Sequence, residues 1–208
     1  MFGPRQNTPL QDQTGIITPA PVHFVRSHST LPDTDPQKYR LLVHGLVNRP
    51  LEFSLDDLKR LPSESRIHFL ECQGNSSPGH RGHRKFEFAT VQDLHGATSC
   101  SEWTGVSLSV LLKETGLKRE GTWLVSEGLD AGRYTYTLPI GKALDDAMVV
   151  YGQNGEALRP DQGYPMRLLV PGWEGPYSVK WLRQIKVVDQ PYMAWDEAIE
   201  EFRCRPLR

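Results

Sequence analysis

Ile67-His-Phe-Leu-Glu-Cys-Gln-Gly-Asn75 is the stretch of sequence that decides how this chain is interpreted. Its apolar first half predicts a buried strand that carries the thiol of Cys72 to its end. Gln73-Gly74-Asn75 and the Ser-Ser-Pro-Gly run at 76–79 cannot continue a strand, so the chain must turn there. A single thiol at that point suits a nucleophile or a metal ligand, although a free cysteine is often only a small core residue. This segment alone leaves both interpretations open.

The composition is that of a globular protein. The chain has 208 residues, of which 38% are hydrophobic and 24% charged, and its net charge is −1. This balance gives no electrostatic argument for binding nucleic acid or an anionic membrane. No stretch approaches the ~18 consecutive apolar residues that a membrane span needs. Residues 1–15 are polar, so we expect no cleavable signal peptide in the chain as written.

The cysteines and histidines do not form a recognisable metal-binding pattern. Cys72, Cys100 and Cys204 are too few for a disulfide scaffold and include no CxxC pair. The seven histidines show no HxxxH spacing of the kind that binds zinc. His80 and His83 lie in a basic stretch at 79–85, which suits either an anion-binding loop or an ordinary solvated loop.

Many short strands and few short helices are expected along the chain. A helix begins at Ser54 and ends at Leu61-Pro62, another spans 106–115 with Gly116 as its cap, and a helical turn occupies 140–145. No βαβ rhythm, GxGxxG, Walker loop or repeat is present, so we expect an α+β fold with several mixed sheets. Strands are expected at 39–45, 66–71, 122–126, 134–138, 148–151, 167–170, 179–182 and 184–188.

A series of short motifs in a fixed order resembles one known family. The series is similar to the molybdenum-cofactor domain of the sulfite oxidase family, and looks most like the sulfite dehydrogenase catalytic subunit of bacterial sulfur-oxidising systems. The resemblance runs from about Gly15 to Met193 and rests on Phe24-Val25-Arg26-Ser27-His28, Glu71-Cys72-Gln73-Gly74-Asn75, Glu102-Trp103-Thr104-Gly105-Val106, Gly128-Leu129-Asp130, Gly163-Tyr164-Pro165-Met166-Arg167-Leu168, Val170-Pro171-Gly172-Trp173-Glu174-Gly175 and Val179-Lys180-Trp181-Leu182.

The resemblance implies a molybdenum–molybdopterin enzyme whose metal is bound by one protein thiolate, that of Cys72. A soft thiolate suits such a metal, and a metal deprotonates a coordinating thiol. Arg26 would face both cofactor and substrate, since a guanidinium offers a planar fork to an oxyanion. Tyr134 matches the active-site tyrosine. Without the family, Arg26 would be taken as an exposed arginine of the arm and Tyr134 as an ordinary strand aromatic.

The same resemblance implies which residues hold the pterin and its phosphate. Arg167 and Lys180 supply positive charge, and Ser178 supplies a hydroxyl. Without the family, Arg167 could be a charged residue at a strand edge, Lys180 a solvated lysine and Ser178 an ordinary serine. Asp130, which the family places near the cofactor, could equally be a turn residue. The full set of expected cofactor-binding residues is Phe24, Arg26, His28, Cys72, Asp130, Gln162, Arg167, Ser178, Val179 and Lys180.

The chain departs from the animal members of the family at several positions. Ser76-Ser77 replace arginines, for which Arg81 or Arg84 could substitute, while Gln162 and Ser178 replace histidines; these changes fit the bacterial branch better. The expected organisation is an extended arm at 1–22, a molybdopterin-binding domain at 23–190, and a tail at 191–208 that begins a shortened dimerisation domain.

The implied activity is oxidation of sulfite to sulfate, with electrons passed to a separate c-type cytochrome because the chain has no CxxCH haem motif. Alternatives are a related molybdenum reductase of an S-oxide or nitrate, and a cofactor-binding fragment without turnover. A cysteine hydrolase using Cys72 would need His28, His68 or His80 as base. The relatives are exported, so a periplasmic parent protein, dimeric when complete, is expected; for the chain as written, in which no signal is visible, the cytoplasm is the alternative.

Overall fold

The structure, a computed structural model, describes residues 5–76, 90–194 and 197. Short helices are scattered among many strands in several sheets, which confirms the expected α+β class. The strands are β1 (Arg5–Gln6), β2 (Val25–Arg26), β3 (Leu41–Gly45), β4 (Leu51–Phe53), β5 (Ser63–Glu71), β6 (Thr98–Ser107), β7 (Trp123–Gly128), β8 (Thr135–Pro139), β9 (Met148–Gln153), β10 (Glu156–Ala157), β11 (Arg167–Leu169) and β12 (Leu182–Val188). The helices are α1 (Leu55–Arg60), α3 (Val91–His95), α4 (Leu108–Thr115) and α5 (Ile140–Asp145), with 3-10 turns η1 (Leu10–Asp12), η2 (Ala20–Val22), η4 (Pro160–Gln162) and η5 (Gly175–Tyr177).

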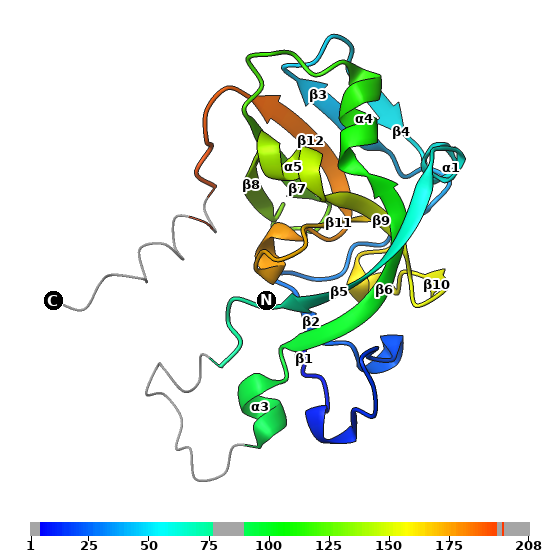
Figure 1. Cartoon of the computed structure of the whole chain (residues 1–208), viewed down its shortest axis with the longest axis vertical. Helices are drawn as coiled ribbons and strands as arrows, with labels where there is room; N and C mark the ends of the chain where they lie inside the picture. The colour runs from blue at the N-terminus through cyan, green and yellow to red at the C-terminus, as the bar shows by residue number, and fades with distance from the viewer. Residues whose placement is uncertain (1–4, 77–89, 195–196, 198–208) are drawn as a thin grey trace, which may run out of the picture.

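Two five-stranded sheets form the body of the molecule (Figure 1). One has the order β4-β3-β12-β7-β8, with β12 parallel to β3 and antiparallel to β7. The other has the order β10-β9-β6-β5, with β11 pairing to β9. A two-stranded ribbon of β1 and β2 completes the architecture. Strands far apart in the sequence therefore meet in each sheet, and the loops between them gather near β2, β11 and the end of β5.

The local sequence explains why these elements form where they do. Ser54 caps α1 through a capping box with Asp57, whose backbone N–H donates to the serine hydroxyl at 3.1 Å. Helix α4 buries Leu108, Leu111 and Leu112 completely, as their helical spacing predicts. These leucines belong to a large core cluster that joins both sheets, and a second cluster surrounds the buried ring of Trp103.

Several expected elements differ from the observed ones. Strand β6 was not expected, because its serine, threonine, glutamate and glycine residues give no apolar pattern. The strand extends to Ser107, so α4 begins at Leu108 and not at residue 106 as expected. Strands were expected at 179–182 and 184–188, but the structure has a single strand there, β12. It begins at Leu182 because Trp181 adopts a positive φ of 49° just before it. Residues 5–22, expected as an extended arm, pack on the domain: the N–H of Thr8 donates to Gly96 O and that of Thr18 to Cys100 O, both at 2.7 Å.

Strand β5 was expected to be buried, and this is wrong. It lies at the edge of its sheet, so only one face and one edge are covered, and Ile67 and Phe69 are 56% and 59% exposed. No helix in the described part of the chain is long and apolar enough to span a bilayer.

Candidate functional site

Cys72 lies directly after β5, where the strand ends in a tight turn. Its backbone N–H donates to Ala97 O at 2.9 Å, and its carbonyl accepts from the N–H of Asn75 at 2.8 Å. The N–H of Gly74 points at the sulfur, 3.4 Å away. The partly buried thiol packs on the Trp103 cluster, which also contains Phe24. The turn therefore presents one sulfur toward the loops around β2 and β11.

A second loop passes close to Cys72. A Cβ on Gly175 would lie 3.0 Å from the carbonyl oxygen of Glu71 and 3.4 Å from the Cα of Cys72. A side chain at this position would press on the cysteine turn, so glycine favours this close approach of the Pro171–Gly175 loop. The motif around Trp173 and the motif around Cys72, a hundred residues apart in sequence, thus form one surface.

Arg167 is buried beside this surface. Its guanidinium donates to Gln162 O at 3.1 Å, to Gln162 Oε1 at 3.2 Å and to Ser178 O at 2.8 Å, and it lies 5.3 Å from the ring of Trp103. Its Nε is buried and has no partner among the described residues. Burial lowers the pKa of Arg167 to about 9, because the interior disfavours its charge. No carboxylate forms an ion pair with this cation in the described structure.

Lys180 is a second cation in the same place. Its ammonium donates to Ser27 Oγ at 2.7 Å and to the backbone oxygen of Asp161 at 2.9 Å. The pKa of Lys180 is lowered to about 7, chiefly by burial and also by the charge of Arg167, against the opposing effects of Asp161, Asp130 and Cys72. Two enclosed cations that repel one another are expensive to bury without a counter-charge, so this region is suited to bind an anionic group.

His23 belongs to this region and was missed from the sequence. It is buried, its Nδ1 donates to Phe24 O at 3.0 Å, and its ring packs edge-on against Trp103. Its Nε2 has no partner among the described residues. Burial lowers the pKa of His23 to about 3, with Arg167 and Lys180 also lowering it, so the ring is neutral at physiological pH. Only its position beside Phe24 in the motif could have pointed to it.

Gln162 links the N-terminal motif to Arg167. Its amide nitrogen donates to Phe24 O at 3.0 Å while its oxygen accepts from Arg167. Gly163 follows with a φ of +103°, and a Cβ there would lie 2.9 Å from Lys180 Cβ. The expected cofactor residues Phe24, Gln162, Arg167 and Lys180 are therefore one connected network. Only the tertiary fold reveals that Gln162 holds the arginine in place.

Arg26 lies on β2 within electrostatic range of Cys72. Its guanidinium donates to Gln6 O at 3.1 Å, to Val25 O at 2.9 Å and to the side-chain oxygen of Asn7. Partial burial lowers the pKa of Arg26, and the charge of the Cys72 thiolate opposes this shift. The ribbon of β1 and β2 thus holds the Arg26 cation within electrostatic range of the thiol.

Tyr134 belongs to a row of aromatic rings on the other side of the site. The ring of Tyr134 lies 4.5 Å from that of exposed His28 and 5.1 Å from that of Tyr136, which contacts Tyr177 at 5.0 Å. Trp173 continues the row at 4.7 Å from Tyr177 and brings it back to the loop over Cys72.

The remaining expected residues play structural parts that the sequence did not specify. Asp130 is buried and accepts from the N–H of Tyr134 at 2.9 Å and from Ser29 Oγ at 3.0 Å. Ser178 Oγ accepts from the N–H of Val170 at 3.0 Å, and the backbone of Val179 accepts from Leu168 N–H at 2.9 Å.

Ser77, His80, Arg81, His83, Arg84 and Cys204 lie outside the described residues. Across the described ranges, no group of three or more histidine, cysteine, aspartate or glutamate side chains is placed to hold a metal ion.

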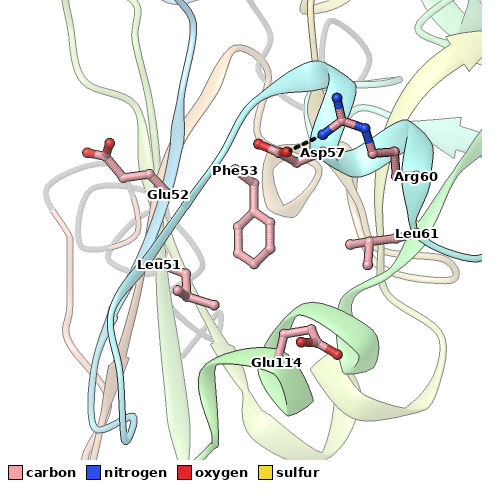
Figure 2. Close-up of a pocket in the computed structure, with 7 residues that line it drawn as sticks. All are labelled: Leu51, Glu52, Phe53, Asp57, Arg60, Leu61 and Glu114. Carbon is pink, nitrogen blue, oxygen red and sulfur yellow. Dashed lines mark hydrogen bonds and ion pairs between the residues drawn. The ribbon is translucent and has the colours of Figure 1, made fainter.

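A separate surface hollow of about 350 Å³ lies between β4, α1 and α4 (Figure 2). Leu51, Phe53 and Leu61 line it, and its charged neighbours include Glu52, Glu114 and the ion pair of Asp57 with Arg60, 3.0 Å apart. It contains none of the expected site residues.

Comparison with known proteins identifies the family. Residues 28–195 match the family described as the oxidoreductase molybdopterin binding domain. The sulfane dehydrogenase SoxCD from Paracoccus pantotrophus superimposes with a TM-score of 0.85 at 41% identity, covering 90% of this chain and 48% of that one. An NADH nitrate reductase from Ulva prolifera is 36% identical, covering 87% of this chain and 22% of the relative. Mitochondrial sulfite oxidase from Mus musculus is 33% identical, and the match covers 87% of this chain and 35% of the relative.

The chain thus spans less than half of each of these relatives. The residues present fit the family's cofactor, molybdenum bound to molybdopterin. Among the described residues, the buried Nε of Arg167 has no hydrogen-bond partner, and neither Arg167 nor Lys180 forms an ion pair, although Asp161 and Asp130 lie within electrostatic range of Lys180. The phosphate of the cofactor would supply an anion for both cations. The fold, the site and the comparisons agree that this chain belongs to the family of molybdopterin-binding oxidoreductase domains related to sulfite oxidase and nitrate reductase.

Proposed function

We propose that the chain is the catalytic domain of a molybdenum-dependent dehydrogenase that oxidises sulfite to sulfate and passes the electrons to a c-type cytochrome. The observation that carries this proposal is the thiol of Cys72, presented beside Arg26 and backed by the buried Arg167 and Lys180. The choice of a sulfur substrate is supported by the 41% identity to a sulfane dehydrogenase, compared with 36% to the nitrate reductase of Ulva prolifera.

In this proposal Cys72 is the single protein ligand of the metal, and the bound cofactor supplies a centre that exchanges two electrons with substrate. Arg26 orients the oxyanion through its planar fork of donors. The phenol of Tyr134 hydrogen-bonds a substrate oxygen. Arg167 and Lys180 neutralise the cofactor phosphate, which also removes the penalty of burying two cations.

The remaining roles position these groups. Gln162 holds Arg167 against the backbone of Phe24, and Asp130 fixes the turn that carries Tyr134. Ser178 and Val179 would contact the cofactor through a loop that their own hydrogen bonds already order, and exposed His28 would close the edge of the site.

A second candidate is nitrate reduction, favoured by the several nitrate reductases among the relatives. Nitrate and sulfite are both small oxyanions, so the same arginine could orient either. A cofactor-binding unit without turnover is the third candidate, because the chain spans only part of its relatives. We further propose a periplasmic parent protein, which rests on the resemblance to exported relatives alone.

The test is to express the chain with molybdate in a host that makes molybdopterin, and to measure metal content and two activities. Roughly one molybdenum per chain with sulfite-dependent reduction of cytochrome c supports the proposal. Nitrate-dependent oxidation of a reduced viologen dye, without sulfite activity, supports the second candidate. Stoichiometric molybdenum with neither activity supports the third, and a folded protein without molybdenum contradicts all of them.

A further inference from the structure

The outer edge of β5 presents backbone groups that pair with no other strand among the described residues. The backbone of Cys100 on β6 bonds to Thr18, through N–H to Oγ1 at 3.2 Å and through its carbonyl at 2.7 Å, and that of Glu102 bonds to Asn154. These groups therefore point away from β5. Their cross-strand neighbours, Phe69 and Ile67, must point their own N–H and C=O groups to the opposite side, which is the outer edge of the sheet.

The same residues carry the largest apolar side chains on the exposed face of this strand. Phe69 is 59% exposed and Ile67 is 56% exposed, and β5 pairs with no strand but β6 among the described residues (Figure 1). Natural proteins usually blunt such an edge with charge, proline or a bulge, because it invites another strand to pair. Here the nine-residue strand has none of these devices on its central exposed positions.

The strand is also nearly neutral and complementary to itself. Arg66 forms an ion pair with Glu64 at 2.9 Å, so two copies of β5 can approach without strong repulsion. An isologous contact about a two-fold axis requires antiparallel pairing of the two strands. In such a pairing, the residue numbers of every two facing residues have the same sum. Only odd-numbered residues point their backbone outward, so Ile67 must face an odd-numbered partner.

Two observations select the register. The Gly175 loop lies against the carbonyl of Glu71, so Glu71 cannot pair, and a register centred on His68 would then retain only the two Ile67–Phe69 pairs, fewer than a register centred on Ile67. A register centred on Arg66 would place two arginines directly opposite, which is unfavourable. The register centred on Ile67 needs no pairing of Glu71 and does not bring the two arginines together. In it, Ile67 faces Ile67 of the second copy, and Phe69 faces the small Ser65 on either side.

We propose that β5 is a homodimer interface, at which two copies of this chain join their sheets by antiparallel β5–β5 pairing centred on Ile67. One short strand pair buries little surface, so the dimer is weak and its fraction rises with protein concentration. The contact adds backbone hydrogen bonds and a central apolar cluster of Ile67 and Phe69 from both copies.

Cysteine cross-linking tests the register in the full chain. In Ile67→Cys the two new thiols face one another across the axis, within the reach of a disulfide bond. In the control Ser65→Cys they lie about four residues apart along the strands, roughly 13 Å, and cannot be bridged. We expect a covalent dimer from Ile67→Cys under mild oxidation, with peptide mapping to exclude links through Cys72, Cys100 or Cys204. Cross-linking by Ser65→Cys but not by Ile67→Cys would overturn the proposal.

Sedimentation velocity over a range of concentrations tests the interface itself. Wild type should shift from monomer toward dimer, and Phe69→Lys should remain monomeric with an unchanged melting temperature. Leu144→Lys, which places a lysine at another exposed apolar site on α5, should dimerise like wild type. A wild-type chain that stays monomeric, or a dimer that Phe69→Lys does not weaken, refutes β5 pairing; so does capture of β5 by a different protein in preference to a second copy.

Discussion

Replacing Lys180 by methionine should make the cofactor-free protein more stable at neutral pH and less stable at alkaline pH. Burial lowers the pKa of Lys180 from 10.5 to about 7, so the folded protein holds this proton less tightly than the unfolded chain does. Between pH 7 and 10.5 the unfolded chain therefore binds more protons, and wild-type stability rises with pH across that window. Methionine has a similar shape and no charge, so the variant lacks this dependence.

The size of the effect follows from the structure. Each unit of pKa shift corresponds to about 1.4 kcal/mol. The loss of wild-type stability caused by the buried charge of Lys180 therefore grows to roughly 4 kcal/mol as the pH falls from 10.5 to 7. Methionine also loses the hydrogen bonds to Ser27 and to the Asp161 carbonyl, which together contribute about 2 kcal/mol. The variant should thus be about 2 kcal/mol more stable than wild type at pH 7, and about 1 kcal/mol less stable near pH 10.

Urea unfolding of both proteins at several pH values between 7 and 10 measures this difference directly. Lys186→Met, at an exposed position of β12, is the matched control and should track wild type. Parallel stability profiles for wild type and Lys180→Met would refute the reasoning that an enclosed ammonium is held there against its preference. The same variant should bind less molybdenum when expressed with molybdate, because the cofactor phosphate loses a cation.

Three further predictions concern single side chains. Cys72→Ser should abolish molybdenum binding, measured by metal analysis, while circular dichroism shows a folded protein; full metal content in the variant would rule out the proposed ligand. Gln162→Leu should lower unfolding free energy by about 2 kcal/mol in urea titrations, because Phe24 O and Arg167 each lose one of their hydrogen bonds; no change would mean that the amide is not a link. Ser54→Ala should remove about 1 kcal/mol of capping energy and leave molybdenum content at the wild-type level.

The ordered motifs identified the family because each carries a residue type that few other contexts require. The Cys72 turn, the arginine of Phe24-x-Arg26 and the cations at 167 and 180 were all expected from the chain, and their assigned roles remain predictions for the experiments above. Local structure was recovered where it depends on local signals, such as the cap at Ser54 and the leucine spacing of α4.

Strand β6 and the exposure of β5 were not recovered from the chain. A run such as Ile67 to Leu70 has the same apolar content whether it is central in a sheet or at an edge. Which of these it becomes depends on where other strands pair, and that is decided by residues distant in sequence.

The sequence by itself determined the fold class and the family, since these follow from composition and from motifs read within short windows. Only the tertiary structure decided that His23 lies with Arg167 and Lys180, that Gln162 joins Phe24 to Arg167, and that β5 has a free edge. The physical reason is that burial, pKa and strand pairing depend on neighbours brought together from separate loops. No local stretch of sequence contains those neighbours.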